Sequence, residues 1–362
     1  MNYRLIPYTL HFKFKAGTSR GYLTQKTSYF IILNDAHGRQ GIGEAAPVPG
    51  LSPDDHPHLP KQAHQLLGEL CRQTFDSLDE ALQWVAAHCP HGFPSLRFGV
   101  ETALRSFWAS HPLVLFDSPF VQGKQGIPIN GLVWMGNLDF MQEQIEEKLQ
   151  QGFRCIKMKI GALEVEKELD LLRKLRQRFS ADALTLRVDA NGAFDSKQAM
   201  PVLEALAQLE VHSIEQPIRP GQWDAMARLC QESPTPIALD EELIGIHTRE
   251  EKRQLLEHIH PHYIILKPTL TGGLEAANEW IRLAESMDIG WWATSALESN
   301  VGLNAISQWT ATWAPKLPQG LGTGQLYHNN LPLPLEIHTG QLYAHFDPTP
   351  PVADFEQWFN TQ

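Results

Sequence analysis

The chain has 362 residues, of which 43% are hydrophobic and 20% charged, an ordinary composition for a soluble globular protein that buries its own core. Its formal net charge of −11 excludes partners that need a broad basic field, namely nucleic acid and anionic membrane surfaces, but leaves a small anionic substrate open. The four cysteines form no Cys-x-x-Cys pair, and neither a signal peptide nor a long apolar run is visible, so we expect reduced thiols, no zinc site and a cytoplasmic protein.

The first part of the chain predicts a small α+β domain. Alternating apolar and polar residues over 8–14 indicate a strand with one buried face, and a second strand follows over 27–33. The segment 16–21 between them carries two glycines and indicates a loop. Leucine spacing over 60–110 indicates helices, so strands followed by helices predict an α+β domain over 1–125.

From about residue 126 short β-rich runs alternate with longer amphipathic stretches. Eight such units predict a parallel β/α barrel over 126–334. We expect its strands over 127–133, 155–160, 184–189, 213–215, 237–240, 263–267, 290–295 and near Leu321. Strand-like spacing after that predicts that 335–362 folds back onto the first domain and completes it.

Charged residues occur at the ends of the expected barrel strands, which is where the active site of such a barrel lies. Lys157 and Lys159 are two residues apart on the second strand and therefore face the same side. Arg187, Asp189 and Asn191 share one face of the third strand in the same way. Such charges are costly to bury without partners, so we expect them to meet in one pocket inside the barrel.

Three acids, Asp189, Glu215 and Asp240, end three successive strands. A nearby lysine or arginine would explain any one of them as an ion pair. Three carboxylates in register repel one another and favour a divalent cation as their common partner. Oxygen-only ligands favour Mg²⁺ or Mn²⁺ over Zn²⁺.

Two lysines, Lys159 and Lys267, lie on the second and sixth strands and therefore face each other across the barrel. A lysine beside other cations and near a metal has its pKa lowered, so it can act as a base near neutral pH. A metal beside the substrate stabilises the negative charge that proton removal creates. The pattern predicts an enzyme that removes a proton from the carbon next to a carboxylate, on a small-molecule substrate; it predicts no particular oligomeric state.

These motifs resemble the enolase superfamily, in the muconate-lactonizing-enzyme branch with Lys-x-Lys on strand two. The matching pieces are Lys157-Met158-Lys159, Asp189-Ala190-Asn191, Ile214-Glu215-Gln216-Pro217, Leu239-Asp240-Glu241, Lys267-Pro268 with Gly272-Gly273, and Gly43-Glu44-Ala45-Ala46-Pro47. The resemblance covers essentially the whole chain and implies a modified TIM barrel, (β/α)7β, with an α+β N-terminal capping domain. A lysine base combined with Mg²⁺ is a pattern of that superfamily.

Within the branch, the runs 294–303 and 320–324 most resemble the o-succinylbenzoate synthases, dehydratases of menaquinone biosynthesis. The resemblance implies syn-dehydration of 2-succinyl-6-hydroxy-2,4-cyclohexadiene-1-carboxylate. Lys159 would remove the proton next to the ring carboxylate and return it to the departing hydroxyl. Lys267 would stabilise the ring anion from the other face, as a cation over a π-system. The implied metal ligands are Asp189, Glu215 and Asp240.

The same resemblance implies a set of substrate contacts, with a loop around Ser19 and Arg20 closing over the succinyl chain. The expected contacts are Lys157, Arg187, Asn191, Ser19, Arg20, Ser295 and Gly324.

Other activities remain open on the same residues. Racemases of N-acylated, especially N-succinylated, amino acids and dipeptide epimerases also need a base on each face of the substrate. Dipeptide epimerases resemble one another in an Asp-x-Asp pair at the end of strand eight, where this chain has Gly322-Thr323-Gly324. A non-catalytic binding relative would have lost the lysines or the acids. A barrel hydrolase would need histidine ligands that the strand ends lack.

Overall fold

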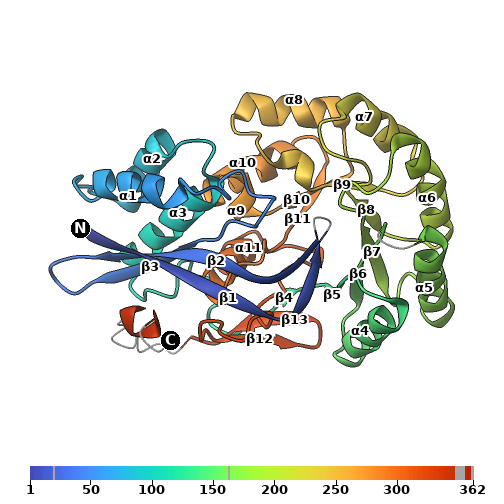
Figure 1. Cartoon of the computed structure of the whole chain (residues 1–362), viewed down its shortest axis with the longest axis horizontal. Coiled ribbons are helices and arrows are strands. Elements are labelled where there is room, and N and C mark those ends of the chain that lie inside the picture. Colours follow the sequence, from blue (N-terminus) through green and yellow to red (C-terminus); the bar gives the residue numbers. More distant parts are fainter. Residues whose placement is uncertain (19–20, 162–163, 347–354, 360–362) are drawn as a thin grey trace.

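The computed structural model describes residues 1–18, 21–161, 164–346 and 355–359. The chain opens with a three-stranded antiparallel sheet of β1 (Asn2–Thr18), β2 (Gly21–Asn34) and β3 (Gln40–Ala45). Three helices follow, as the leucine spacing predicts: α1 (Leu59–Leu70), α2 (Leu78–His88) and α3 (Pro94–Trp108). Together they form the capping part, to the left of the barrel in Figure 1.

Helix α3 lies directly on strand β3. A Cβ atom at Gly43 would lie 2.0 Å from the carbonyl oxygen of Gly99, so only glycine permits this approach. The contact holds the β3 end, which carries Glu44, between α3 and the barrel.

Seven parallel strands form the barrel wall in chain order. They are β5 (Gly131–Val133), β6 (Cys155–Lys159), β7 (Thr185–Asp189), β8 (Ser213–Glu215), β9 (Ile237–Leu239), β10 (Tyr263–Leu266) and β11 (Gly290–Ala293). The helices around them are α4 (Leu138–Gln150), α5 (Val165–Arg178), α6 (Ser196–Gln208), α7 (Trp223–Glu232), α8 (Arg249–Ile259), α9 (Pro268–Thr271), α10 (Leu274–Glu285) and α11 (Asn300–Thr312), with a short 3₁₀ turn η1 (Glu241–Leu243) after β9. Helices α4 to α8 curve around the outside of the strands (Figure 1).

The barrel is closed by a short extended segment at the eighth position. Gln319 forms a parallel bridge with Ile129, and Gly320 forms one with Thr294 beyond β11. The backbone amide of Asn130 donates to the carbonyl of Gln319 at 2.9 Å. The (β/α)7β barrel with an α+β capping part is therefore confirmed, and its eighth strand is reduced to bridging residues next to Leu321.

The last described residues divide between the two parts. Strand β12 (Leu335–His338) pairs with β13 (Gln341–Ala344), and β13 pairs with β4 (Ile127–Pro128), just before the first barrel strand. The 3₁₀ turn η2 (Phe355–Phe359) instead packs on the capping sheet, where Phe359 lies 4.8 Å from Phe30 between ring centroids. The domain boundary at residue 125 stays a prediction. Among the described helices, none combines the length and apolar character that crossing a membrane requires.

Candidate active site

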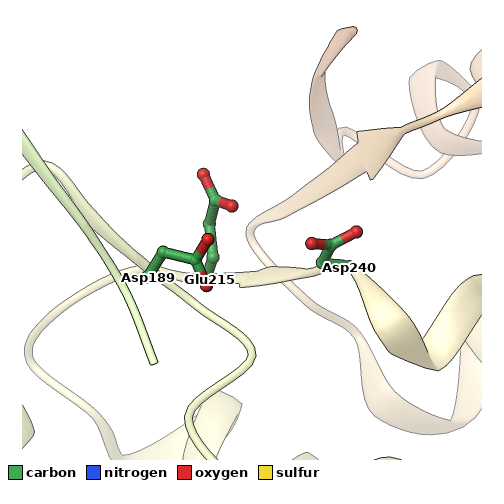
Figure 2. Close-up of side chains that lie close together, drawn as sticks. All are labelled: Asp189, Glu215 and Asp240. Atoms are coloured by element: carbon green, nitrogen blue, oxygen red, sulfur yellow. The ribbon is translucent and has the colours of Figure 1, made fainter. Parts of the chain in front are cut away.

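The three strand-end acids meet inside the mouth of the barrel. Asp189 ends β7, Glu215 ends β8 and Asp240 follows β9, and one carboxylate oxygen of each lies within 4.8 Å of the others (Figure 2). Their exposed fractions are 2%, 0% and 2%. The parallel register aligns Asp189 with Glu215, so the convergence follows from strand pairing.

Three lysines approach this acid cluster from different strands. Lys157 contacts Asp189 at 3.0 Å and forms a short contact with Glu215. Lys159 lies 3.1 Å from Asp189 and donates to the Asn191 side chain at 2.6 Å. From the opposite side, Lys267 lies 2.5 Å from Asp240. The sixth strand thus faces the second across the cluster.

Burial and charge set the protonation of these groups. Burial outweighs the Lys157 contact and raises the pKa of Glu215 to about 7. The pKa of Asp189 is lowered, because Lys157, Lys159 and Lys267 together outweigh its burial. Burial disfavours the charged form of Lys267, but Asp240 and Glu241 outweigh it and raise its pKa. Without a metal ion, the acids therefore hold Lys267 in its charged form.

The acid cluster fits a divalent metal ion. All its donors are carboxylate oxygens, which hard cations prefer. One of them, Oε1 of Glu215, is buried without a hydrogen-bond partner. An unpaired carboxylate oxygen in the interior is costly, and a cation would satisfy it. Asp189, Glu215 and Asp240 have the composition of the divalent metal site found in enolase-like barrels.

A pocket opens above the acid cluster. Its polar wall includes Lys157, Lys159, Asn191, Lys267 and Ser295. Its apolar wall comes from the barrel and from a loop of the capping part, and consists of Val48, Pro49, Leu51, Leu132, Trp134, Leu270, Ala296 and Leu297. The pocket thus combines positively charged lysines with an apolar surface, which suits a small, partly apolar carboxylate.

Some expected substrate contacts lie elsewhere. Arg187 is 0% exposed; it donates to the Pro318 carbonyl at 2.7 Å and covers the Trp292 ring at 3.9 Å. It shares a face with Asp189 but lies two residues, roughly 7 Å, deeper along the strand. Gly324 adjoins the pocket residue Thr323 without itself lining the pocket. Ser19 and Arg20 lie outside the described residues.

The structure adds two acids that the sequence interpretation gave no role. Glu241 lines the pocket and accepts a hydrogen bond of 2.9 Å from Asn191. Glu298 is fully buried and accepts from Ser295 at 2.6 Å and from the amide of Ala296 at 2.8 Å. Glu241 directly follows Asp240, and Glu298 lies within the run 294–303. Their positions inside these motifs were the sequence signal that could have identified them.

A second group of residues fixes the segment after β11 from the capping part. Lys26 of β2 donates to the Leu297 carbonyl at 3.0 Å, and Tyr327 donates to the same oxygen at 2.7 Å. Glu44 accepts from the amide of Ser299 at 2.9 Å and from that of Gly302 at 2.9 Å, at the start of α11. The bonds made by Lys26 and Glu44 connect residues more than 250 positions apart, which no local pattern reveals.

Comparison with known proteins agrees with this geometry. Residues 140–348, more than half of the chain, match the family model described as enolase C-terminal domain-like. The chain is 47% identical over 356 residues to an o-succinylbenzoate synthase of Desulfotalea psychrophila, covering 92% of this chain and 96% of that protein.

Solved structures give the same relationship. The crystal structure of MenC from Desulfotalea psychrophila superposes with a TM-score of 0.84 at 43% identity, covering 95% of this chain and 99% of the other. The muconate lactonizing enzyme of Pseudomonas putida shares the fold, with a TM-score of 0.78, 21% identity and coverage of 99% and 98%. The chain therefore belongs to the enolase superfamily, in the subgroup that includes the muconate-lactonizing enzymes.

Proposed function

We propose that this chain is an o-succinylbenzoate synthase, which dehydrates 2-succinyl-6-hydroxy-2,4-cyclohexadiene-1-carboxylate to o-succinylbenzoate in menaquinone biosynthesis. The observation that carries the proposal is the placement of Lys159 and Lys267. Both line the same pocket from opposite strands, and each pairs with a different acid of the cluster. The 47% identity to an o-succinylbenzoate synthase over nearly the whole chain supports this choice of reaction.

The acids Asp189, Glu215 and Asp240 would hold the metal, with Mg²⁺ preferred and Mn²⁺ a substitute. When bound, the ion would neutralise the acids and supply positive charge to the substrate carboxylate and to the negative charge that develops when the proton is removed.

The lysines perform the proton transfers. Lys159, as the general base, takes the proton from the ring carbon next to the carboxylate. Charged Lys267, on the opposite face, stabilises the resulting ring anion electrostatically. The bond between the ring and the hydroxyl then breaks, and Lys159 returns its proton to the departing oxygen as water. Because the ring becomes aromatic, the reaction is downhill.

Other residues position the substrate and these lysines. Asn191 accepts from Lys159 and donates to Glu241, which fixes the direction of the base. Lys157 bridges Asp189 and Glu215 and holds the acids in place. Ser295 lies at the pocket wall, where its hydroxyl donates to Glu298, and Leu132 and Trp134 are among the apolar lining residues. We assign Arg187 to supporting the barrel floor below Lys157, and Gly324 to the segment that flanks the pocket.

The test follows the ultraviolet absorbance change as the ring becomes aromatic, with purified protein, Mg²⁺ and the hydroxycyclohexadiene substrate. We expect fast turnover that is abolished by a chelator, by Lys159→Ala and by Lys267→Ala. The exposed helix residue Lys174 provides a matched control, because Lys174→Ala removes the same charge outside the site. Failure of folded, metal-loaded protein to turn over the substrate would contradict the proposal.

A second candidate is racemisation of N-succinylamino acids. The paired lysines favour it, because racemisation needs a base on each face and both line one pocket. Deuterium uptake at the α-carbon of both N-succinyl enantiomers would support this activity, and its absence would remove it. Dipeptide epimerisation is disfavoured, since Gly322 and Thr323 occupy the pocket wall where an acid pair would bind an amino group.

A further inference from the structure

A second cleft lies outside the barrel, between helices α3, α8 and α10. It has a volume of about 310 Å³, within the range of small-ligand pockets. The residues that line it are Arg97, His247, Arg249, Lys252, Glu275, Ala276, Glu279, Arg282 and Leu283. None of them belongs to the active-site pocket.

The cleft is positive in an acidic protein. Four of its side chains are cationic and two are carboxylates, whereas the whole chain has a formal net charge of −11. Both carboxylates already have partners: Glu279 lies 2.7 Å from Lys252, and Glu275 forms a short contact with Arg105. The cleft therefore keeps a surplus of positive charge, which focuses its field on a bound anion.

Most of this surplus positive charge lies on two of the arginines, Arg249 and Arg282. Within the described part of the chain, the guanidinium groups of Arg249 and Arg282 have no ion pair or hydrogen bond, and both are exposed. Arg97 uses one nitrogen on Glu101, at 3.0 Å. Their free N–H groups are donors of the kind that bind oxyanions strongly.

The cations also crowd one another. Burial lowers the pKa of Lys252, although Glu279 opposes it, and Arg97 lowers it further. Burial lowers the pKa of His247 too, and His91, Lys252 and Arg97 add to the effect. Lys252 is 1% exposed, so its charge is held among other charges with little water. An anion in the cleft would relieve this repulsion.

We propose that this cleft is a binding site for a phosphoryl anion. Arg97, Arg249 and Arg282 come from three different helices, so a ligand that reaches all three needs oxygens pointing in several directions. A tetrahedral phosphoryl group has them, whereas the two oxygens of a carboxylate lie in one plane. The volume accommodates two linked phosphoryl groups better than a single ion.

The position of the cleft gives binding a structural effect. Arg97 belongs to the capping part, and the other two arginines belong to the barrel. Next to Arg97, Glu101 accepts from the amide of Leu274 at 2.7 Å, at the start of α10. An anion bound by all three arginines would therefore strengthen the contact between the capping part and the barrel, and raise the melting temperature.

The test measures binding of inorganic pyrophosphate to metal-free protein by titration calorimetry at constant ionic strength. We expect one site, weakened at least about tenfold in the double variant Arg249→Gln/Arg282→Gln, since charge-assisted hydrogen bonds are lost. The control pair Arg72→Gln/Arg154→Gln removes two exposed arginines elsewhere and should leave binding unchanged. Dehydratase activity with Mg²⁺ should be equal in the wild type and in both double variants.

Further arms separate the alternatives. If the wild type binds ADP and Arg249→Gln/Arg282→Gln does not, a nucleotide is a source of the phosphoryl group. If the wild type binds pyrophosphate but not ADP, the ligand is a free phosphate. Pyrophosphate binding that persists in this variant would place the anion on the active-site lysines and overturn the proposal. Binding of citrate in place of pyrophosphate would overturn the phosphoryl assignment.

Discussion

Lys26 of the capping sheet donates a hydrogen bond of 3.0 Å to the backbone carbonyl of Leu297, which lines the active-site pocket of the barrel. Leu297 has a φ of +64°, a left-handed conformation that is unfavourable for leucine and needs support from its surroundings. Burial lowers the pKa of Lys26, while Glu44 and Glu298 oppose that effect. A lysine from one part of the fold thus fixes the pocket wall of the other.

Replacing Lys26 with methionine should weaken substrate binding more than chemistry. The variant keeps the apolar stem but removes the donor, so Leu297 is free to relax away from its strained conformation. We expect kcat/KM to fall about tenfold or more, mostly through KM, because a charged hydrogen bond contributes about 1.5–3 kcal/mol. Tyr327→Phe removes the other donor to the same oxygen and should shift KM in the same direction. A change confined to kcat in both variants would contradict a positioning role.

Mg²⁺ should stabilise the folded protein in proportion to its binding. At a free concentration of about one hundred times Kd, a ligand of the folded state adds about 2.7 kcal/mol to the free energy of unfolding. Glu215→Gln removes one ligand charge and should lose most of this stabilisation. The matched change Glu232→Gln, at the exposed end of α7, should retain it. Equal melting temperatures of the wild type with Mg²⁺ and with a chelator would argue against a metal at the acid cluster.

The carboxyl of Asp54 should make stability depend on pH. It accepts hydrogen bonds from Ser95 and Leu96 at the start of α3, but burial outweighs them and raises its pKa to about 6, from 3.8. The folded state then binds the proton more tightly than the unfolded state. The contribution is fully present below pH 3.8 and is lost as pH rises through 6.

Asp54→Asn should remove that dependence. From pH 4 to pH 7, the stability of the variant relative to wild type should rise by up to about 3 kcal/mol, for a pKa difference near two units. The neutral amide also buries an unpaired donor, but this cost is equal at every pH. Urea denaturation at several pH values measures the difference, and a constant difference would show that Asp54 does not titrate in this range.

Two adjacent glycines before α10 provide a matched pair of substitutions. Gly272 and Gly273 have φ angles of +101° and +95°, so alanine is strained at both. At Gly273 a Cβ would also lie 2.3 Å from the carboxylate of Glu101, whereas at Gly272 the nearest atom is 3.4 Å away. Gly272→Ala should cost about 1–2 kcal/mol, and Gly273→Ala clearly more, because Glu101 must leave the α10 amides. Equal losses in thermal unfolding would show that the Glu101 contact contributes little.

Much of the site could be predicted because strand geometry repeats. Side chains two residues apart share a face, and parallel strands end at one edge. Lys159, Asp189 and Glu215 therefore meet as the sequence predicts. The roles of these residues in catalysis stay predictions until the variants are measured.

The alternation of side chains shows which face of a strand a residue occupies, but not how far below the pocket it lies. Arg187 faces inward like Asp189 but stacks on Trp292 below the pocket. Long-range contacts are equally hidden: nothing near Lys26 in the sequence indicates that it reaches Leu297. The partner of the C-terminal hairpin was also hidden, since β13 pairs with the two-residue strand β4 and such a short strand has no periodicity of its own.

The starts of two barrel helices obtain their hydrogen-bond acceptors from outside the barrel. Glu101 of α3 accepts from the first amide of α10, and Glu44 of β3 accepts from amides at the start of α11. A polypeptide cut between the capping part and the barrel would remove these carboxylate acceptors from both helix starts and expose the faces that bury them. Such a fragment should not hold its native shape alone. The intact chain should therefore melt in one cooperative calorimetric transition, because the capping part and the barrel depend on each other for their native structure.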